Sequence, residues 1–179
     1  PDYQIARMLS QGGVVRADKG EEYFPVYYVE PYIGNEVAMG FDLSTNQERF
    51  EALCRSRDTG KAVATSRITL VQEEGDQYGF LIFVPVYHKQ ASIDTIEERR
   101  ANLTGLVSGV FRVGDLVEET LGYLKGQGVD VYLFDTSNPQ DVQFLYYHPS
   151  RLGHDVNPPL SLEEIKSEGL YVSTILNVA

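Results

Sequence analysis

The chain has 179 residues, of which 15 are Lys or Arg and 26 are Asp or Glu, so its formal net charge is −11. A chain of this length removes roughly 70% of its unfolded surface from water, so it needs no disulfide or structural metal. The acidic balance argues against a nucleic-acid partner and against adhesion to an anionic membrane, because both require clustered cations.

Hydrophobic periodicity and turn residues predict two helices and one strand in the first third of the chain. A short helix is expected within residues 3–15. A strand rich in aromatic and β-branched residues is expected from Phe24 to Glu30. The second helix is the clearest, since Ser44 and Gln47 have the spacing of a capping box and Gly60 supplies a C-terminal stop.

The middle of the chain is typical of a sheet. A short strand is expected at Ala62–Ile68 and a long one at Phe80–Tyr87, in which Pro85 indicates an edge or a bulge. A polar connection over residues 88–101 leads to another strand, Asn102–Arg112. The two longer strands are nearly continuous apolar runs, and such strands need cover on both faces. One candidate for that cover is a ligand.

The last third predicts a helix over Asp115–Lys125, strands at Val129–Phe134 and Val142–Tyr147, a short helix after a capping box at Ser161–Glu164, and a final strand at Leu170–Val178. Short strands with hairpin-type links, and helices set to one side, indicate an α+β fold with antiparallel sheets. No membrane-spanning run and no signal peptide is present in this sequence, and we expect an excised piece of a larger protein.

Five short motifs follow one another in a distinctive order. They are Tyr28–Pro31 (YVEP), Gly40–Leu43 (GFDL), Leu70–Glu73 (LVQE), Phe80–Tyr87 (FLIFVPVY) and Gly105–Arg112 (GLVSGVFR). Together they resemble CHASE domains, which are the extracellular or periplasmic sensory domains of membrane-bound histidine kinases and nucleotide cyclases. The resemblance covers most of residues 20–179.

The resemblance implies two tandem PAS-like modules with antiparallel sheets. The larger, membrane-distal module at residues 1–125 would bind a small ligand, and the membrane-proximal module would occupy residues 126–179. It also implies a homodimer in the full-length protein, anchored by flanking membrane helices. In the plant cytokinin receptors of this family, an acidic residue just before a Tyr-x-Pro-Val segment hydrogen-bonds the adenine ligand, and a threonine on the following strand lies by the pocket. The matching residues are Glu21, which is one methylene longer than the Asp of those receptors, and Thr65.

Aromatic and charged residues near these positions have two interpretations each. Tyr23 and Tyr28 can stack a flat ligand or can pack in the sheet. Glu30 can bind a cationic ligand, or it can pair with Arg67 or Arg112, and we favour the internal pair because an unpaired buried carboxylate is costly.

Arg112 suits a carboxylate ligand, or it anchors the loop that follows its strand. Asp42 is interpreted first as a turn or capping residue. The predicted ligand-binding set is Glu21, Tyr23, Tyr28, Glu30, Thr65, Phe83 and Arg112.

Catalytic chemistry has little support in this sequence. It contains no Gly-x-Ser-x-Gly, no phosphate loop and no Cys/His pair, and His148 and His154 are expected at the surface. We therefore expect a non-enzymatic periplasmic sensory domain with no cofactor or metal. Its small ligand would be an adenine derivative, an organic acid or a peptide, and a histidine kinase or diguanylate cyclase would be the output. The alternative is a structural or dimerisation spacer that binds nothing, or a sensor that binds a protein.

Overall fold

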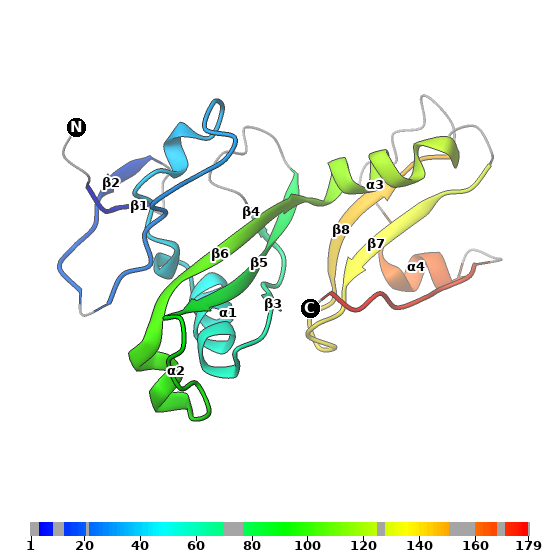
Figure 1. Cartoon of the computed structure of the whole chain (residues 1–179). Helices are drawn as coiled ribbons and strands as arrows, with labels where there is room; N and C mark the ends of the chain where they lie inside the picture. The colour runs from blue at the N-terminus through cyan, green and yellow to red at the C-terminus, as the bar shows by residue number, and fades with distance from the viewer. Residues whose placement is uncertain are drawn as a thin grey trace.

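The chain folds into an α+β arrangement of helices and antiparallel strands, as the sequence predicts (Figure 1). The computed structural model describes residues 4–8, 13–20, 22–69, 77–124, 128–150, 160–167 and 171–178. The strands are β1 (Ala6–Met8), β2 (Val14–Arg16), β3 (Val63–Ala64), β4 (Ile68–Thr69), β5 (Tyr78–Tyr87), β6 (Leu103–Arg112), β7 (Val131–Asp135) and β8 (Gln143–His148). The α-helices are α1 (Gln47–Thr59), α2 (Ile96–Asn102), α3 (Val113–Leu121) and α4 (Leu162–Ser167), and the short 3-10 helices are η1 (Glu36–Ala38), η2 (Leu43–Thr45) and η3 (Gly122–Leu124).

Strand β5 is the centre of the main sheet. It pairs antiparallel with β6 along one edge, and with β3 and β4 in succession along the other. The strand predicted at Phe80–Tyr87 is therefore confirmed. Pro85 lies beyond Phe83, the last β5 residue paired with β3, so its missing N–H costs no hydrogen bond to that strand. The register with β6 shifts between Val86 and Tyr87, which places the predicted irregularity next to this proline.

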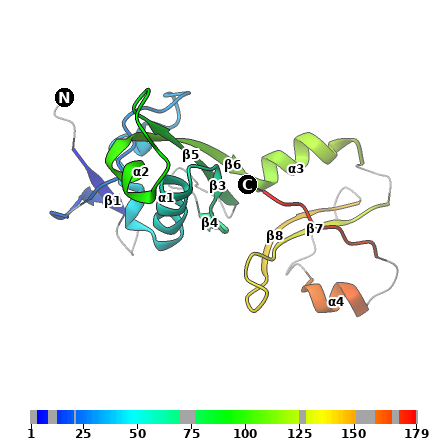
Figure 2. The same ribbon diagram turned by 60° about the horizontal axis from the view of Figure 1, so that its bottom comes forward.

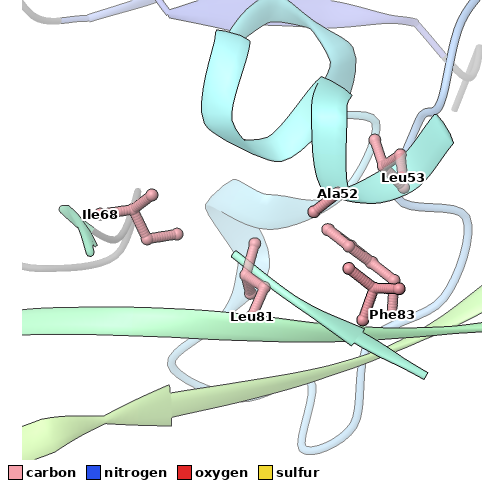
Figure 3. Packing of buried hydrophobic residues seen from close by; sticks show 6 residues of the cluster. Ala52, Leu53, Ile68, Leu81 and Phe83 are labelled. Carbon is pink, nitrogen blue, oxygen red and sulfur yellow. The ribbon is translucent and has the colours of Figure 1, made fainter. Parts of the chain in front are cut away.

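Helix α1 packs on one face of the main sheet and forms the core with it. Figure 3 shows Ala52 and Leu53 of α1 against Leu81 and Phe83 of β5, with Ile68 of β4 beside them. Leu53 is 1% exposed and Phe83 is 0% exposed. Burying one such side chain contributes about 1.5–3 kcal/mol, so these contacts hold the helix on the sheet.

The opposite face of the main sheet carries exposed apolar side chains. Alternation along β5 places Phe80, Ile82 and Val84 on this face, with Val107 of β6 directly across from Val84. Val84 is 43% exposed and Val107 is 61% exposed. The expected cover is thus present on the α1 face, whereas the second face is open in the part of the chain that the structure describes.

The first segments differ from the prediction. In place of a helix within residues 3–15, β1 and β2 form a two-stranded antiparallel hairpin. Ala6 N donates to Gly40 O at 2.8 Å, and Asp42 N donates to Ala6 O at 2.7 Å. These bonds join segments far apart in the sequence, so local periodicity carries no signal for them.

The predicted strand Phe24–Glu30 is also wrong. Its ladder is reduced to one isolated bridge between Pro25 and Asp42, next to which Val26 N donates to Phe41 O at 3.0 Å. The bonds on either side of this bridge need no N–H from Pro25. Pairing stops because Phe41 N donates within its own segment, to Ala38 O at 3.0 Å, so aromatic composition alone misled the prediction.

Helix α1 begins after Asn46 and not after Ser44. The Asn46 side chain accepts a hydrogen bond from Arg49 N at 3.0 Å. Ser44 instead lies in η2, where its N–H and hydroxyl donate to Asp42, which confirms the interpretation of Asp42 as a capping residue. The helix ends at Gly60 with φ of 73°, as the sequence predicts.

Two predictions in the middle of the chain need correction. The strand expected at Ala62–Ile68 is divided into β3 and β4, because between them Thr65 hydrogen-bonds Leu81 through its hydroxyl as well as its backbone. The connection at residues 88–101 contains α2, whose capping box joins Thr95 and Glu98. That spacing is visible in the sequence and is the signal that the prediction overlooked.

A second unit follows β6. Helix α3 begins at Val113, two residues before the expected Asp115, and packs on the antiparallel β7–β8 hairpin. Both hairpin strands lie within two residues of their predicted positions. Figure 2 shows α3 following β6 out of the main sheet and lying beside this hairpin, with α4 on the hairpin's other side.

The C-terminal predictions are confirmed in one of two cases. Ser161 and Glu164 form the predicted capping box of α4 through bonds of 2.7 and 3.3 Å. The predicted strand Leu170–Val178 is wrong for residues 171–178, which are exposed and form no strand with any described segment, and Leu170 lies outside the described residues.

Candidate functional site

The predicted ligand residues lie in different environments. Glu21 is outside the residues that the structure describes. Tyr23 closes a local turn, in which its hydroxyl donates to Asp18 O at 2.8 Å and accepts from Gly20 N. Tyr23 also lines an open hollow of about 530 Å³ beside the β1–β2 hairpin.

Tyr28 and Glu30 contact each other on an exposed loop. The Tyr28 hydroxyl donates to Glu30 Oε2 at 3.0 Å, and Tyr28 is 74% exposed. The expected ion pair of Glu30 with Arg67 or Arg112 is therefore wrong. Glu30 is exposed, and no Lys or Arg side chain of the described residues forms an ion pair with it.

Three other predicted residues have structural contacts. Thr65 Oγ1 accepts from Leu81 N at 3.0 Å, and Phe83 is fully buried in the core. Arg112 ends β6, where its Nη1 lies 3.7 Å from Asp115 Oδ2. The ligand role of each remains a prediction.

Arg49 is a buried cation that the sequence analysis missed. It is 6% exposed, its Nη2 donates to Thr69 O at 3.0 Å, and its guanidinium carbon lies 5.5 Å from the centroid of the Phe41 ring. Its Nε is buried and has no hydrogen-bond acceptor among the described residues. Burial lowers the pKa of Arg49, because desolvation disfavours the charged form.

The sequence places Arg49 on the inner face of α1. Ala52 and Leu53, three and four residues later, form the core, so Arg49 projects from the same side of the helix. Phe41 beneath it is 1% exposed, and its backbone donates to Ala38 O and accepts from Val26 N, each at 3.0 Å. This helical spacing is the signal that identifies Arg49 as buried.

A second buried arginine on the same helix differs from Arg49 in its partners. Arg57 is 8% exposed, and its guanidinium nitrogens lie 3.0 Å from Glu22 Oε1 and 2.8 Å from Asp58 Oδ1. Arg100 of α2 adds a 2.6 Å contact to Asp58, and the hydrogen bond from Arg100 lowers the pKa of Asp58 to about 2. Arg49 has no such carboxylate in the described part of the chain, and a buried charge without one is costly. It therefore retains the capacity to bind an anion.

His148 corrects the expectation of a surface histidine. It is fully buried, and its Nδ1 lies 2.8 Å from Glu118 Oε1, to which the Tyr146 hydroxyl also donates at 3.0 Å. Burial and then this bond to Glu118 raise the pKa of Tyr146 to about 12. The three side chains fasten α3 to β8, while His154 lies outside the described residues.

Two further properties bear on function. Across the residues with described positions, no group of three or more His, Cys, Asp or Glu side chains is arranged to hold a metal ion. Over the same residues, none of the helices combines the length and the hydropathy needed to cross a membrane.

Comparison with known proteins places the chain in a family. The sequence model of the CHASE domain matches residues 1–146, which is most of the chain. The chain belongs to the CHASE domain family. This confirms the resemblance that its ordered motifs indicate.

Similar proteins are signal-transduction kinases. This CHASE domain is 32% identical over 151 residues to probable histidine kinase 4 of Oryza sativa subsp. japonica, covering 80% of this chain and 14% of that protein. It is 26% identical over 148 residues to hybrid signal transduction histidine kinase A of Dictyostelium discoideum, covering 79% of this chain and 7% of that protein. Histidine kinase 2 of Arabidopsis thaliana is 28% identical over 128 residues, or 70% of this chain and 10% of that protein. The chain thus spans a small part of the length of the relatives it matches, and it is a CHASE sensory domain of the type found in histidine kinases.

Proposed function

We propose that this CHASE domain is the extracytoplasmic, non-enzymatic part of a membrane receptor. A small molecule binds in its first PAS-like module, at residues 1–125, and the signal passes through a second module at residues 126–179 to a histidine kinase or diguanylate cyclase domain. The full-length receptor acts as a homodimer. The family match and the histidine kinases among the relatives support this proposal.

The observation that carries the ligand role is the environment of Arg49. A guanidinium with 6% exposure, a free Nε–H and no carboxylate partner among the described residues is suited to an incoming anion. A carboxylate matches the guanidinium fork in geometry and charge, and the Phe41 ring beneath it offers an apolar surface to the rest of the ligand. Among the expected ligand classes, Arg49 therefore favours organic acids and the carboxyl groups of amino acids or peptides over adenines.

A thermal-shift screen tests this function. The arms are organic acids such as succinate and citrate, amino acids, short peptides and adenine derivatives. Binding to the folded state at a hundred times Kd stabilises by about 2.7 kcal/mol, which is roughly 5–10 °C for a chain of this size. We expect a carboxylate to raise the Tm, Arg49→Gln to abolish the rise, and Arg55→Gln, an exposed residue on α1, to retain it.

The packed core favours a second candidate function. Leu53 and Phe83 fill the space between α1 and the sheet, as expected for a spacer or a protein-binding sensor that takes no small ligand. If the domain is such a spacer or protein-binding sensor, no compound in the screen raises the Tm. A rise with adenines alone that persists in Arg49→Gln would keep the sensory function and remove Arg49 from the site.

A further inference from the structure

Arg67 joins the main sheet to the β7–β8 hairpin. Its backbone N donates to Asp135 Oδ2 at 3.0 Å, and its Nη1 donates to Phe144 O at 2.8 Å. Its guanidinium carbon lies 4.0 Å from the centroid of the Tyr78 ring on β5. One residue between β3 and β4 thus binds both hairpin strands while it rests on the main sheet.

Asp135 is held at this joint as an anion. Burial opposes its ionisation, but hydrogen bonds from Ser137 and from Arg67 N outweigh burial and lower the pKa of Asp135. A hollow of about 120 Å³, with Arg67 and Asp135 in its wall, opens beside the contact. The joint therefore has room to rearrange.

Arg49 binds the other end of the same short segment. Its Nη2 donates to the carbonyl of Thr69, two residues after Arg67. Ile68, between them, is 5% exposed in the core and pairs with Gly79 of β5. Because close-packed residues transmit displacements rather than absorb them, a shift at Thr69 reaches Arg67 through two peptide units.

We propose that Arg67 transmits the occupancy of the Arg49 site to the β7–β8 hairpin, an inference that rests on the function proposed above. A carboxylate bound side-on uses Nε and Nη2 of Arg49 and withdraws Nη2 from the Thr69 carbonyl. The segment 67–69 then moves away from α1, and Arg67 releases Asp135 and Phe144. The ligand favours this released state because the Thr69 carbonyl no longer competes with it there for the Nη2 donors.

Hydrogen exchange in the hairpin tests the coupling without any ligand. Arg49→Gln removes the guanidinium from the Thr69 carbonyl and so imitates its withdrawal, while Arg67→Ala removes the bond to Phe144 O. We expect each variant to speed amide exchange over residues 131–148 about tenfold, and the double variant to be no faster than Arg67→Ala alone. Arg55→Gln, exposed on the same helix, leaves exchange at the wild-type rate.

Two outcomes overturn the coupling. One is a wild-type exchange rate in the hairpin of Arg49→Gln, and the other is a double variant whose effect is the sum of the two single effects. Arg49→Lys and Arg67→Lys repeat the test with the charge retained and the planar fork lost, in case a truncated variant does not fold.

Hydrogen exchange, read together with the thermal-shift screen, separates the coupling from the ligand proposal. If no acid raises the Tm, but Arg49→Gln speeds hairpin exchange through Arg67, the coupling holds and the ligand proposal fails. If succinate or another acid of the screen stabilises the protein through Arg49, but leaves hairpin exchange unchanged, the ligand proposal holds and the coupling fails.

Discussion

Arg49 and Arg57 project into the interior from one helix, but the protein groups around their guanidinium groups differ. Arg57 lies between Glu22 and Asp58, whereas Arg49 has a backbone carbonyl and an aromatic ring. The first arrangement fastens α1 to its neighbours. The second leaves donor capacity, which is why the ligand proposal is centred on Arg49.

The network around Asp58 makes stability depend on pH in a defined direction. Its pKa is lowered to about 2, while an aspartate in an unfolded chain titrates near ~3.9. Because the folded-state pKa is the lower one, the stabilisation is present above pH ~4 and is lost as the pH falls through about 2.

We therefore expect Asp58→Asn to cost about 1 kcal/mol at neutral pH, since the side chain of Arg100 is 55% exposed and water screens that pair. The difference from wild type should shrink as the pH falls from 5 to 2. Urea unfolding across this range measures it, with Glu51→Gln, exposed on α1, as the control. Parallel stability curves for Asp58→Asn and wild type would contradict this account of the network.

The buried arginine, the buried histidine and the exposed Glu30 show where sequence reasoning fails for single residues. The sequence analysis overlooked Arg49, although its helical spacing from Ala52 and Leu53 is a local signal that predicts its burial. The burial of His148 depends on Glu118, which is thirty residues earlier and on another element. No local pattern encodes such a pair.

At the scale of elements, α3 connects the two units of the chain. It follows β6 directly, and its Gly114 lies so close to Tyr146 of β8 that an added Cβ would be 2.9 Å from that ring. Glu118, one turn later, accepts from Tyr146 and contacts His148. The helix is therefore fixed to the hairpin by close packing and by one carboxylate.

Removing that carboxylate should loosen this attachment. Glu118→Ala leaves the buried His148 Nδ1 without its carboxylate, and an unsatisfied buried group costs about 1–3 kcal/mol. Glu119→Ala, next to it and exposed, should stay within about 0.5 kcal/mol of wild type. Chemical denaturation of both variants measures the difference, and equal losses would show that Glu118 does not hold α3 to β8.

The elements that the sequence predicted correctly are those with local signals. Strand β5 has a continuous apolar run, α1 has a glycine stop, and α4 has a capping box. Helix α2 also has a capping box, which the prediction overlooked. Two other failures, the β1–β2 hairpin and residues 24–30, lie where backbone hydrogen bonds join segments distant in sequence. Pairing of this kind is decided by the tertiary fold and not by composition.

For the whole molecule, the main sheet is asymmetric. One face forms the core with α1, and the other exposes Val84 and Val107. The sequence analysis expected cover on both faces, but among the described residues α1 covers one face and the other is open. It also suggested a ligand among the strand residues, whereas the ligand proposed here is placed at Arg49 on the helix, whose buried Nε has no hydrogen-bond partner among the described residues.

The central claim is that Arg49 binds a carboxylate in the first module. Isothermal titration of the intact chain with the acid that gives the largest thermal shift tests it most directly. The account predicts one saturable site in wild type and in Arg55→Gln, and an affinity at least tenfold weaker in Arg49→Gln, which corresponds to about 1.4 kcal/mol. Equal affinity in wild type and Arg49→Gln, or no saturable heat with any acid, would contradict it.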